Sequence, residues 1–190
     1  VFEINRNFRN EGMDSSHSPE FTALEAYEAY SDYNGMAELT RNLIQQAARD
    51  AFDLPEGQEI VTLADGTEYD LSGDWDHIDL YGSTSEALGE EITVDTPREK
   101  LLKYADQIGI EVDDYAVNGK IVEDIFEELV ASKLWAPTFV YDFPEDTSPL
   151  TRYHRSRPGL TEKWDLYVRG FETATAYSEL ADPVVQRQRF

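Results

Sequence analysis

Apolar and polar positions alternate at the start of the chain. Phe2 and Ile4 are apolar, polar residues stand on either side of them, and Phe8 follows. A period of two is typical of a strand with one buried face. We therefore predict a strand at residues 1–8, followed by a polar loop that runs to Pro19.

The next run, residues 18–30, fits two structures. Ser18 as an N-cap and Pro19 at the first helical position are typical of a helix start, and strong helix formers follow. In a strand, by contrast, alternate residues such as Phe21, Glu25 and Tyr27 share one face. Local propensity favours the helix by on the order of a few tenths of a kcal/mol per residue, which packing in a sheet can override.

Apolar residues at helical spacing predict three longer helices. One follows Asn34-Gly35 and ends at Pro55, one is N-capped by Thr96 and closed by Gly109, and one opens after residue 117. The expected apolar positions are Met36, Leu39, Leu43, Ala47 and Ala51 in the first helix, and Ile121, Val122, Ile125, Phe126, Leu129 and Val130 in the third. A short helix is predicted at residues 83–88 inside an acidic, irregular stretch (72–95), and a final helix begins at residue 182.

The remaining β-type patterns form hairpins and a loop. Residues 59–63 and 67–71 flank a Gly turn, residues 138–143 are β-rich, and residues 164–168 and 171–177 read as strands joined at Gly170. A loop lies between the β-rich run 138–143 and the strand 164–168. Seven of its residues, 152–158, include four arginines or histidines: Arg152, His154, Arg155 and Arg157.

Composition places the chain among globular proteins. It has 190 residues, 41% hydrophobic and 12% aromatic, which is enough for one sizeable core. The absence of cysteine excludes disulfides and thiolate chemistry. With no long apolar run and no signal peptide, we expect a soluble cytoplasmic protein. Since the chain opens inside a strand pattern without Met, we interpret it as a piece of a longer protein.

Charge argues against this segment supplying the main nucleic-acid surface. The formal net charge is −23, from 39 acids and 16 bases. Binding to phosphates requires clustered Lys and Arg, so we interpret the acids as a solvated surface. An adaptation to high salt is the alternative.

The motifs at both ends resemble one family. Phe8-Arg9-Asn10-Glu11-Gly12, followed by residues 17–22, Glu25 and Tyr27, resembles motif 2 of the class II aminoacyl-tRNA synthetases in the version of the lysyl enzymes. The far end agrees in order and approximate spacing, through residues 137–140, 148–150, 158–162 and 172–180. The resemblance thus covers nearly the whole chain.

The resemblance implies an α+β fold, an antiparallel sheet flanked by helices. It makes residues 18–30 a strand rather than a helix. Residues 1–54 would hold the motif 2 hairpin and the following helix of the catalytic core. Residues 55–135 would be a mainly helical insertion, and residues 136–190 the C-terminal part of the core sheet.

The resemblance also implies an ATP site on the hairpin. Arg9 would be the catalytic residue, contacting the α-phosphate and the amino acid's carboxylate, because a guanidinium can fork onto such oxygens. Glu11 and His17 would lie around the adenine and phosphates, with Phe21 stacked on the base. The alternative from pattern alone is a surface hairpin in which Arg9 and Glu11 pair with each other.

A lysine pocket and a metal pair follow from the same resemblance. Burying an ammonium group requires carboxylate partners, which Glu25 and Glu179 would supply beside the Tyr27 hydroxyl; the alternative for any single Glu in so acidic a chain is solvent exposure. Two further pocket residues are Thr175 and Tyr177, where the family usually has Asn and Phe, and Ser18 stands where Asn is common. The Mg²⁺ ligands would be Asp165 and Glu172, and Asp165 departs from the usual Glu.

The implied activity is that of a lysine–tRNA ligase. ATP would activate L-lysine to lysyl-adenylate, which would then be transferred to tRNA(Lys) by a homodimeric full-length protein. Motif 1, motif 3 and an anticodon-binding domain are expected outside these 190 residues, so the fragment alone is expected to be inactive. The alternatives are a paralogue that lysylates a protein of the elongation factor P type or the lipid phosphatidylglycerol, and a non-catalytic binding domain with the same fold.

Overall fold

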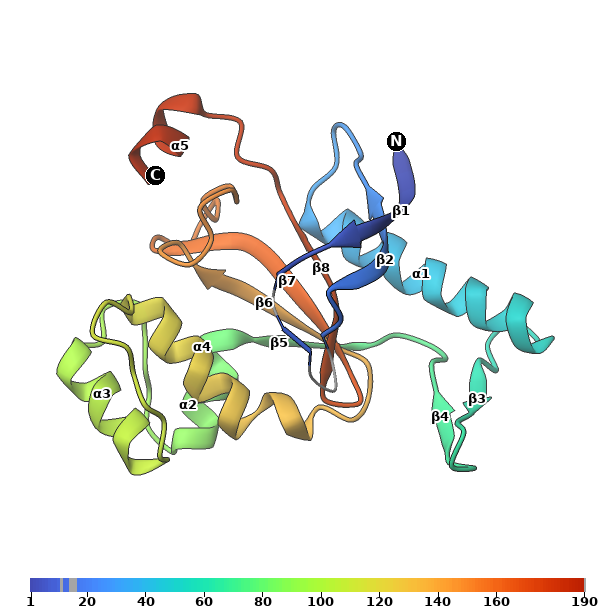
Figure 1. The fold of residues 1–190 in the computed structure, drawn as a ribbon, viewed down its shortest axis with the longest axis horizontal. Coiled ribbons are helices and arrows are strands. Elements are labelled where there is room, and N and C mark those ends of the chain that lie inside the picture. The colour runs from blue at the N-terminus through green and yellow to red at the C-terminus, as the bar shows by residue number, and fades with distance from the viewer. Residues whose placement is uncertain (11, 14–16, 190) are drawn as a thin grey trace. The chain divides into compact units, whose positions relative to one another are not determined.

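The computed structural model describes residues 1–10, 12–13 and 17–189. It divides into two compact units, residues 1–31 and residues 32–190, and each is described by itself (Figure 1).

The first unit is a β-hairpin. Strand β1 (Phe2–Phe8) pairs antiparallel with β2 (Glu20–Ala26), in a register that sets Phe2 opposite Ala26 and Phe8 opposite Glu20. One further backbone bond closes the loop end, from the Arg9 amide to the Pro19 carbonyl at 3.0 Å. Residues 20–26 are thus a strand, as the resemblance implied, and the helix favoured by local propensity is wrong because strand pairing outweighs it.

The second unit is built on a four-stranded sheet in the described part of the chain. Its order is β5 (Asp76–Asp79), β6 (Thr138–Pro144), β7 (Leu160–Val168) and β8 (Phe171–Tyr177). The β6–β7 and β7–β8 pairs are antiparallel, whereas β5 lies parallel to β6. The α+β prediction is confirmed, but β5 was missed inside the acidic stretch because its Asp-rich sequence has weak strand propensity.

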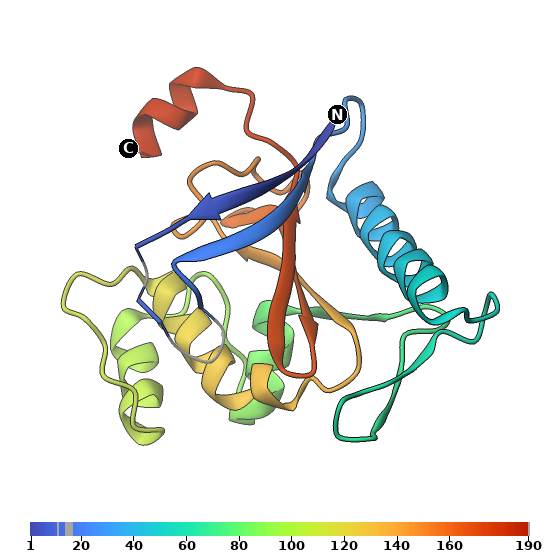
Figure 2. The same ribbon diagram turned by 45° about the vertical axis from the view of Figure 1, so that its right-hand side comes forward.

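Five helices and a small hairpin surround this sheet among the described residues (Figures 1 and 2). The helices are α1 (Tyr33–Phe52), α2 (Leu80–Leu88), α3 (Arg98–Gln107), α4 (Asn118–Leu129) and α5 (Pro183–Arg189), with a 3₁₀ turn at Ala131–Lys133. The hairpin joins β3 (Ile60–Thr62) to β4 (Glu68–Asp70). None of these helices has the length and apolar character needed to cross a bilayer, in the part of the chain that is described.

Strand β7 is buried on both of its faces. On one face, Trp164 belongs to the cluster that includes α1, and its indole Nε1 donates to the Tyr33 carbonyl at 2.6 Å. On the other face, Tyr167 packs edge-on against Phe126 of α4, with ring centroids 5.7 Å apart. The sheet therefore has α1 on one side and α4 on the other.

The apolar stripe predicted for α1 is not the face that the helix buries. Leu39 and Leu43 are each 44% exposed. The buried residues are instead Tyr33, Ala37, Gln45 and Ala48. Gln45 can be buried because its Nε2 donates to the carbonyls of Leu71 and Gly73, at 2.7 and 2.8 Å, which satisfies the amide.

The predicted N-cap of α3 is also corrected. The helix begins at Arg98, after Pro97, and no side chain caps it. Thr96 uses its Oγ1 to accept a hydrogen bond from the Thr93 amide at 2.8 Å. By contrast, the buried positions predicted for α4, from Ile121 to Phe126, are confirmed. The division of the chain at residues 54/55 and 135/136 stays a prediction.

Candidate functional site

The hairpin places a cation beside an aromatic ring. Arg9 follows the end of β1, and its guanidinium carbon lies 5.3 Å from the centroid of the Phe21 ring on β2. Arg9 is exposed and Phe21 half-buried, and His17 is exposed in the loop between the strands. Glu11 lies outside the described residues, and with it the suggested Arg9–Glu11 pair. This geometry suits a ligand that has both a flat ring and an anionic group.

Two lysine-pocket candidates lie together at the other end of β2. The Tyr27 hydroxyl donates to Glu25 Oε2 at 3.2 Å, and both residues are exposed. The Tyr27 amide donates to the Val1 carbonyl at 2.8 Å, so backbone pairing continues just past the strand. The carboxylate is held at the open end of the hairpin, where it can accept from a further donor.

Asp165 is a buried carboxylate with one unsatisfied oxygen. It is 4% exposed, and its Oδ2 accepts from the Lys163 ammonium at 2.8 Å. Its Oδ1 is buried with no hydrogen-bond partner among the described residues. An unpaired buried acceptor is costly, so this oxygen is suited to a cation.

A bulge in β8 brings Glu172 to the same face as Asp165. Asp165 lies opposite Thr175 and Tyr167 opposite Glu172, so Thr173 is the extra residue of β8. Desolvation of the carboxyl group, together with the Asp165 charge, raises the pKa of Glu172 to about 7. The carboxylates of Asp165 and Glu172, the two candidate metal ligands, therefore interact electrostatically. The described residues contain no group of three or more acids or histidines arranged to hold a metal ion.

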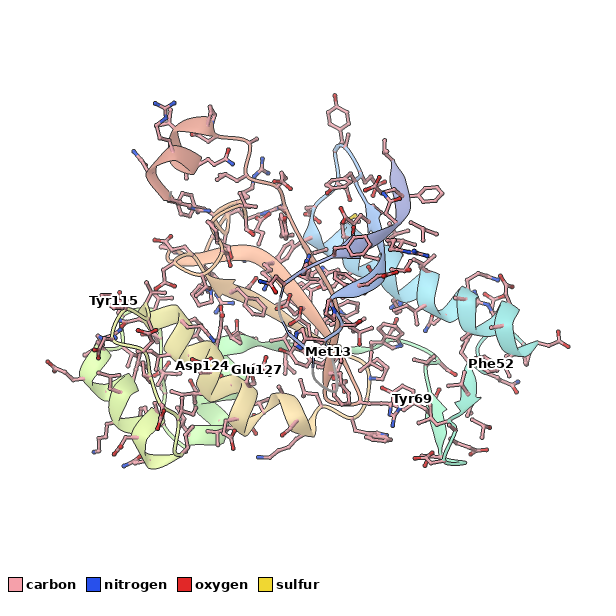
Figure 3. All side chains as sticks on the ribbon, in the orientation of Figure 1. Met13, Phe52, Tyr69, Tyr115, Asp124 and Glu127 are labelled. Atoms are coloured by element: carbon pink, nitrogen blue, oxygen red, sulfur yellow. The ribbon has the colours of Figure 1, made fainter. Side chains whose placement is uncertain are left out.

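Helix α4 adds two carboxylates that the sequence did not single out. The Glu127 carboxylate, labelled in Figure 3, accepts from the Tyr167 hydroxyl. Glu123 accepts from Thr147 Oγ1 at 2.5 Å, and its burial raises its pKa. Their spacing of four residues puts both on one helix face, but nothing local to α4 indicates which strand that face meets.

A small cavity lies beside this acidic cluster. Its volume is about 180 Å³, and its lining consists of residues 147–151, Lys163 and Tyr177. Thr175 lies two residues before Tyr177 in β8, and its Oγ1 donates to the Trp164 carbonyl at 3.2 Å. Glu179 is exposed and forms an isolated antiparallel bridge with Thr151. Of the three β8-side candidates, Tyr177 lines the cavity and Glu179 pairs with Thr151 of its lining.

The basic loop between β6 and β7 is tied into the fold. Arg155 Nε donates to the buried Glu162 carboxylate at 2.6 Å, and Arg157 donates to Asp142 at 2.6 Å. The ring nitrogen Nδ1 of His154 accepts from the amides of Ser156 and Arg157, at 3.1 and 3.0 Å. This loop was expected from the sequence, but its internal pairing was not.

Comparison with known proteins agrees with these motifs. The sequence profile of the family described as tRNA synthetases class II (D, K and N) matches residues 1–190. The chain is 61% identical to a lysine–tRNA ligase of Kineococcus radiotolerans and 59% identical to one of Mycolicibacterium gilvum, in each case over 100% of the chain and 37% or 38% of the relative. It is 48% identical to the lysylphosphatidylglycerol biosynthesis bifunctional protein LysX of Gordonia bronchialis, over 100% of the chain and 17% of that relative. The chain therefore spans less than two-fifths of the length of the ligases that it matches.

Proposed function

The chain belongs to the family of class II tRNA synthetases (D, K and N), and from this premise we propose that its parent protein is a lysine–tRNA ligase. The observation that carries the proposal is 61% identity, along the whole chain, to a relative named a lysine–tRNA ligase. The substrates would be L-lysine, ATP and tRNA(Lys), and the parent would act in the cytoplasm as a homodimer.

The proposed first step joins lysine to AMP. A carboxylate oxygen of lysine attacks the α-phosphorus of ATP, and the bond to pyrophosphate breaks. Arg9 would fork onto the α-phosphate and the attacking carboxylate and stabilise the charge that develops between them. Phe21, next to Arg9, would stack on the adenine, and Glu11 and His17 would contact the base and the phosphates. No covalent enzyme intermediate is needed, so catalysis rests on positioning and electrostatics.

The proposed lysine pocket is built from carboxylates and hydroxyls. Glu25 and Glu179 would balance the side-chain ammonium, and Tyr27, already bonded to Glu25, would help to orient it. Thr175 and Tyr177 would contact the rest of the amino acid. Support for this assignment comes from the match of Glu25, Tyr27 and Glu179 to the family motif, and from the cavity that Tyr177 lines.

The residues of the β7–β8 hairpin fit a magnesium ion. We propose that Asp165 and Glu172 hold it, since Asp165 has an unsatisfied buried oxygen and both carboxylates occupy one face. A bound Mg²⁺ would neutralise charge on the ATP phosphates. Its presence would also relieve the repulsion between the two carboxylates.

Transfer of lysine to a lipid or a protein is the alternative. The observation behind the lipid version is the 48% identity to LysX, which is lower than the 61% identity to the ligase of Kineococcus radiotolerans. Both functions require lysyl-adenylate, so they differ in the acceptor. Incubating the parent protein with labelled lysine and ATP, and then with tRNA, elongation factor P or phosphatidylglycerol vesicles, separates them by which acceptor becomes labelled.

Replacing Arg9 tests the catalytic role. In the full-length parent, Arg9→Ala should lower kcat of lysine-dependent pyrophosphate exchange by about 10²–10³, comparable to the loss of one preorganised donor. Arg9→Lys should recover little, because an ammonium cannot bridge two oxyanions as a planar fork does. Arg6→Ala is the matched control, since Arg6 is exposed on the same strand and pairs with Glu20 at 3.1 Å. Near-wild-type exchange by Arg9→Ala would refute the assignment, and thermal unfolding of the same samples would identify a structural effect.

A further inference from the structure

One residue fastens helix α5 to the loop that lines the cavity. None of the residues of α5 is fully buried. Its last described residue, Arg189, nevertheless donates from Nη1 to the carbonyls of Ser148, Pro149 and Thr151, at 3.1, 3.3 and 2.6 Å. The guanidinium carbon also lies 4.2 Å from the centroid of the Tyr153 ring. Three carbonyl dipoles and one aromatic face thus surround a single cation.

The same loop is held from its other side by backbone pairing. The Arg152 amide donates to the Ser178 carbonyl at 2.8 Å, and the Leu180 amide donates to the Leu150 carbonyl at 3.0 Å. These bonds join the loop to the segment that carries Glu179. Within the loop, the Thr151 amide donates to the Ser148 carbonyl at 3.2 Å, which closes a turn. The carbonyls that converge on Arg189 belong to this turn.

The loop forms most of the cavity wall. Residues 147–151 line the cavity of about 180 Å³, and Tyr177 and Lys163 complete the lining. A change in the direction of the loop carbonyls would therefore move the wall that faces Tyr177. The arrangement also leaves the Arg189 Nη2 buried without a hydrogen-bond partner among the described residues. An unsatisfied buried donor works against stability, which fits a residue whose role is to shape the loop.

We propose that Arg189 is a positioning residue that fixes residues 148–151 as the wall of the amino-acid pocket, and so sets the affinity for lysine. This inference rests on the proposed function, because the pocket's ligand is the lysine of that reaction. Arg189 acts through the loop, by donating hydrogen bonds that orient its carbonyls, and needs no contact with the substrate. A planar fork stacked on Tyr153 does this better than a lysine would, since an ammonium cannot reach three carbonyls while stacking.

Kinetics of the full-length parent provide the first test. Arg189→Ala should raise KM for lysine by about tenfold, because a hydrogen bond to a charged group is typically worth at least that factor. KM for ATP and kcat should change by less than about twofold, since residues 148–151 include none of the residues proposed to contact ATP or the metal ion. Arg189→Lys should fall between Arg189→Ala and wild type, and Arg187→Ala, an exposed arginine on the same helix, should match wild type. An equal rise in both KM values would overturn the proposal.

Hydrogen exchange keeps this inference separate from the proposed function. The amides of Thr151, Arg152 and Leu180 should exchange faster in Arg189→Ala than in wild type, while amides of the β6–β7 pair keep their protection. If the parent showed no lysine-dependent exchange of pyrophosphate, the proposed function would fail, and the amide rates would still decide whether Arg189 holds the loop. Unchanged amide rates, or faster exchange throughout the sheet, would count against the positioning role.

Discussion

At the scale of single residues, Glu162 shows how the basic loop is held. Its side chain is fully buried and accepts from Arg155 Nε at 2.6 Å and Nη2 at 3.1 Å. Arg155 also reaches Asp32, the N-cap of α1, at 3.0 Å. Hydrogen bonds from Arg155 lower the pKa of Glu162 to about 2, against the opposing effect of its burial. One ionised carboxylate thus joins the loop, β7 and the start of α1.

We expect Glu162→Gln to destabilise the fold by about 1.5–3 kcal/mol, the usual value of hydrogen bonds to a charged group. Because the folded-state pKa lies below that of the unfolded chain, this stabilisation is complete above about pH 5 and is lost as pH falls toward 2. The free energy of unfolding, measured between pH 3 and 7, should therefore fall more steeply with acid in wild type than in Glu162→Gln. Glu145→Gln, at an exposed position, is the control. Parallel acid profiles for wild type and Glu162→Gln would contradict the assignment.

At the scale of elements, a β-bulge in β8 and a helix cap supplied by a distant loop position the acidic residues Glu172 and Glu123. The extra residue in β8 turns Glu172 toward Asp165; in an unbulged strand, Glu172 and Thr175, three residues apart, would point to opposite faces. Helix α4, which carries the neighbouring Glu123, has no cap from its own N-cap residue. The Gly119 amide instead donates to Asp146 Oδ2 at 3.1 Å, so a loop distant in sequence caps the helix.

Gly119 should not tolerate a larger side chain. A Cβ there would lie 2.0 Å from Asp146 Oδ1 and 2.6 Å from Pro144 Cβ. Gly119→Ala should therefore cost about 1–3 kcal/mol through overpacking, in spite of alanine's better helix propensity. The midpoint of urea unfolding should fall accordingly, whereas Lys120→Ala, at the exposed next position, should shift it little. Equal stability of Gly119→Ala and wild type would contradict this prediction, because it would mean that Pro144 and Asp146 can move aside with no loss of stability.

At the scale of the whole molecule, the dominant feature is the net charge of −23. Carboxylates this numerous repel one another in the folded state, and salt screens that repulsion. The screening length is about 30 Å at 0.01 M and about 10 Å at 0.1 M ionic strength, so most of the effect falls within this range.

We expect the melting temperature of the protein to rise between about 0.01 and 0.2 M NaCl and to change more slowly above it. Differential scanning calorimetry at pH 7 would measure this, with glucose at matched osmolarity as a control for effects unrelated to charge. A melting temperature that falls with NaCl would show that attractive ion pairs outweigh the repulsion.

The sequence by itself determined the family and most of the elements, and it supplied the candidate residues for the proposed chemistry. The period of two at the start of the chain and the helical spacing of Ile121 to Phe126 predicted β1 and α4 correctly, because both patterns are local. The burial that a period of two suggests is not found in β1, where Phe2, Ile4 and Phe8 are all exposed. The motif around Arg9 and the blocks at the far end indicated the family, which the profile match confirmed.

The tertiary structure alone decided what depends on contacts between distant residues. Residues 20–26 are a strand because they pair with β1, and α1 buries Ala37 rather than Leu43 because the sheet meets that side of the helix. Glu172 approaches Asp165 because of a bulge in β8, and Arg189 reaches the cavity loop because three of its carbonyls point toward one place. Neither feature produces a periodic pattern in the sequence. Local sequence patterns report backbone propensity and an apolar face. Which strands pair, and which distant side chains come together, is set by the free energy of the whole fold.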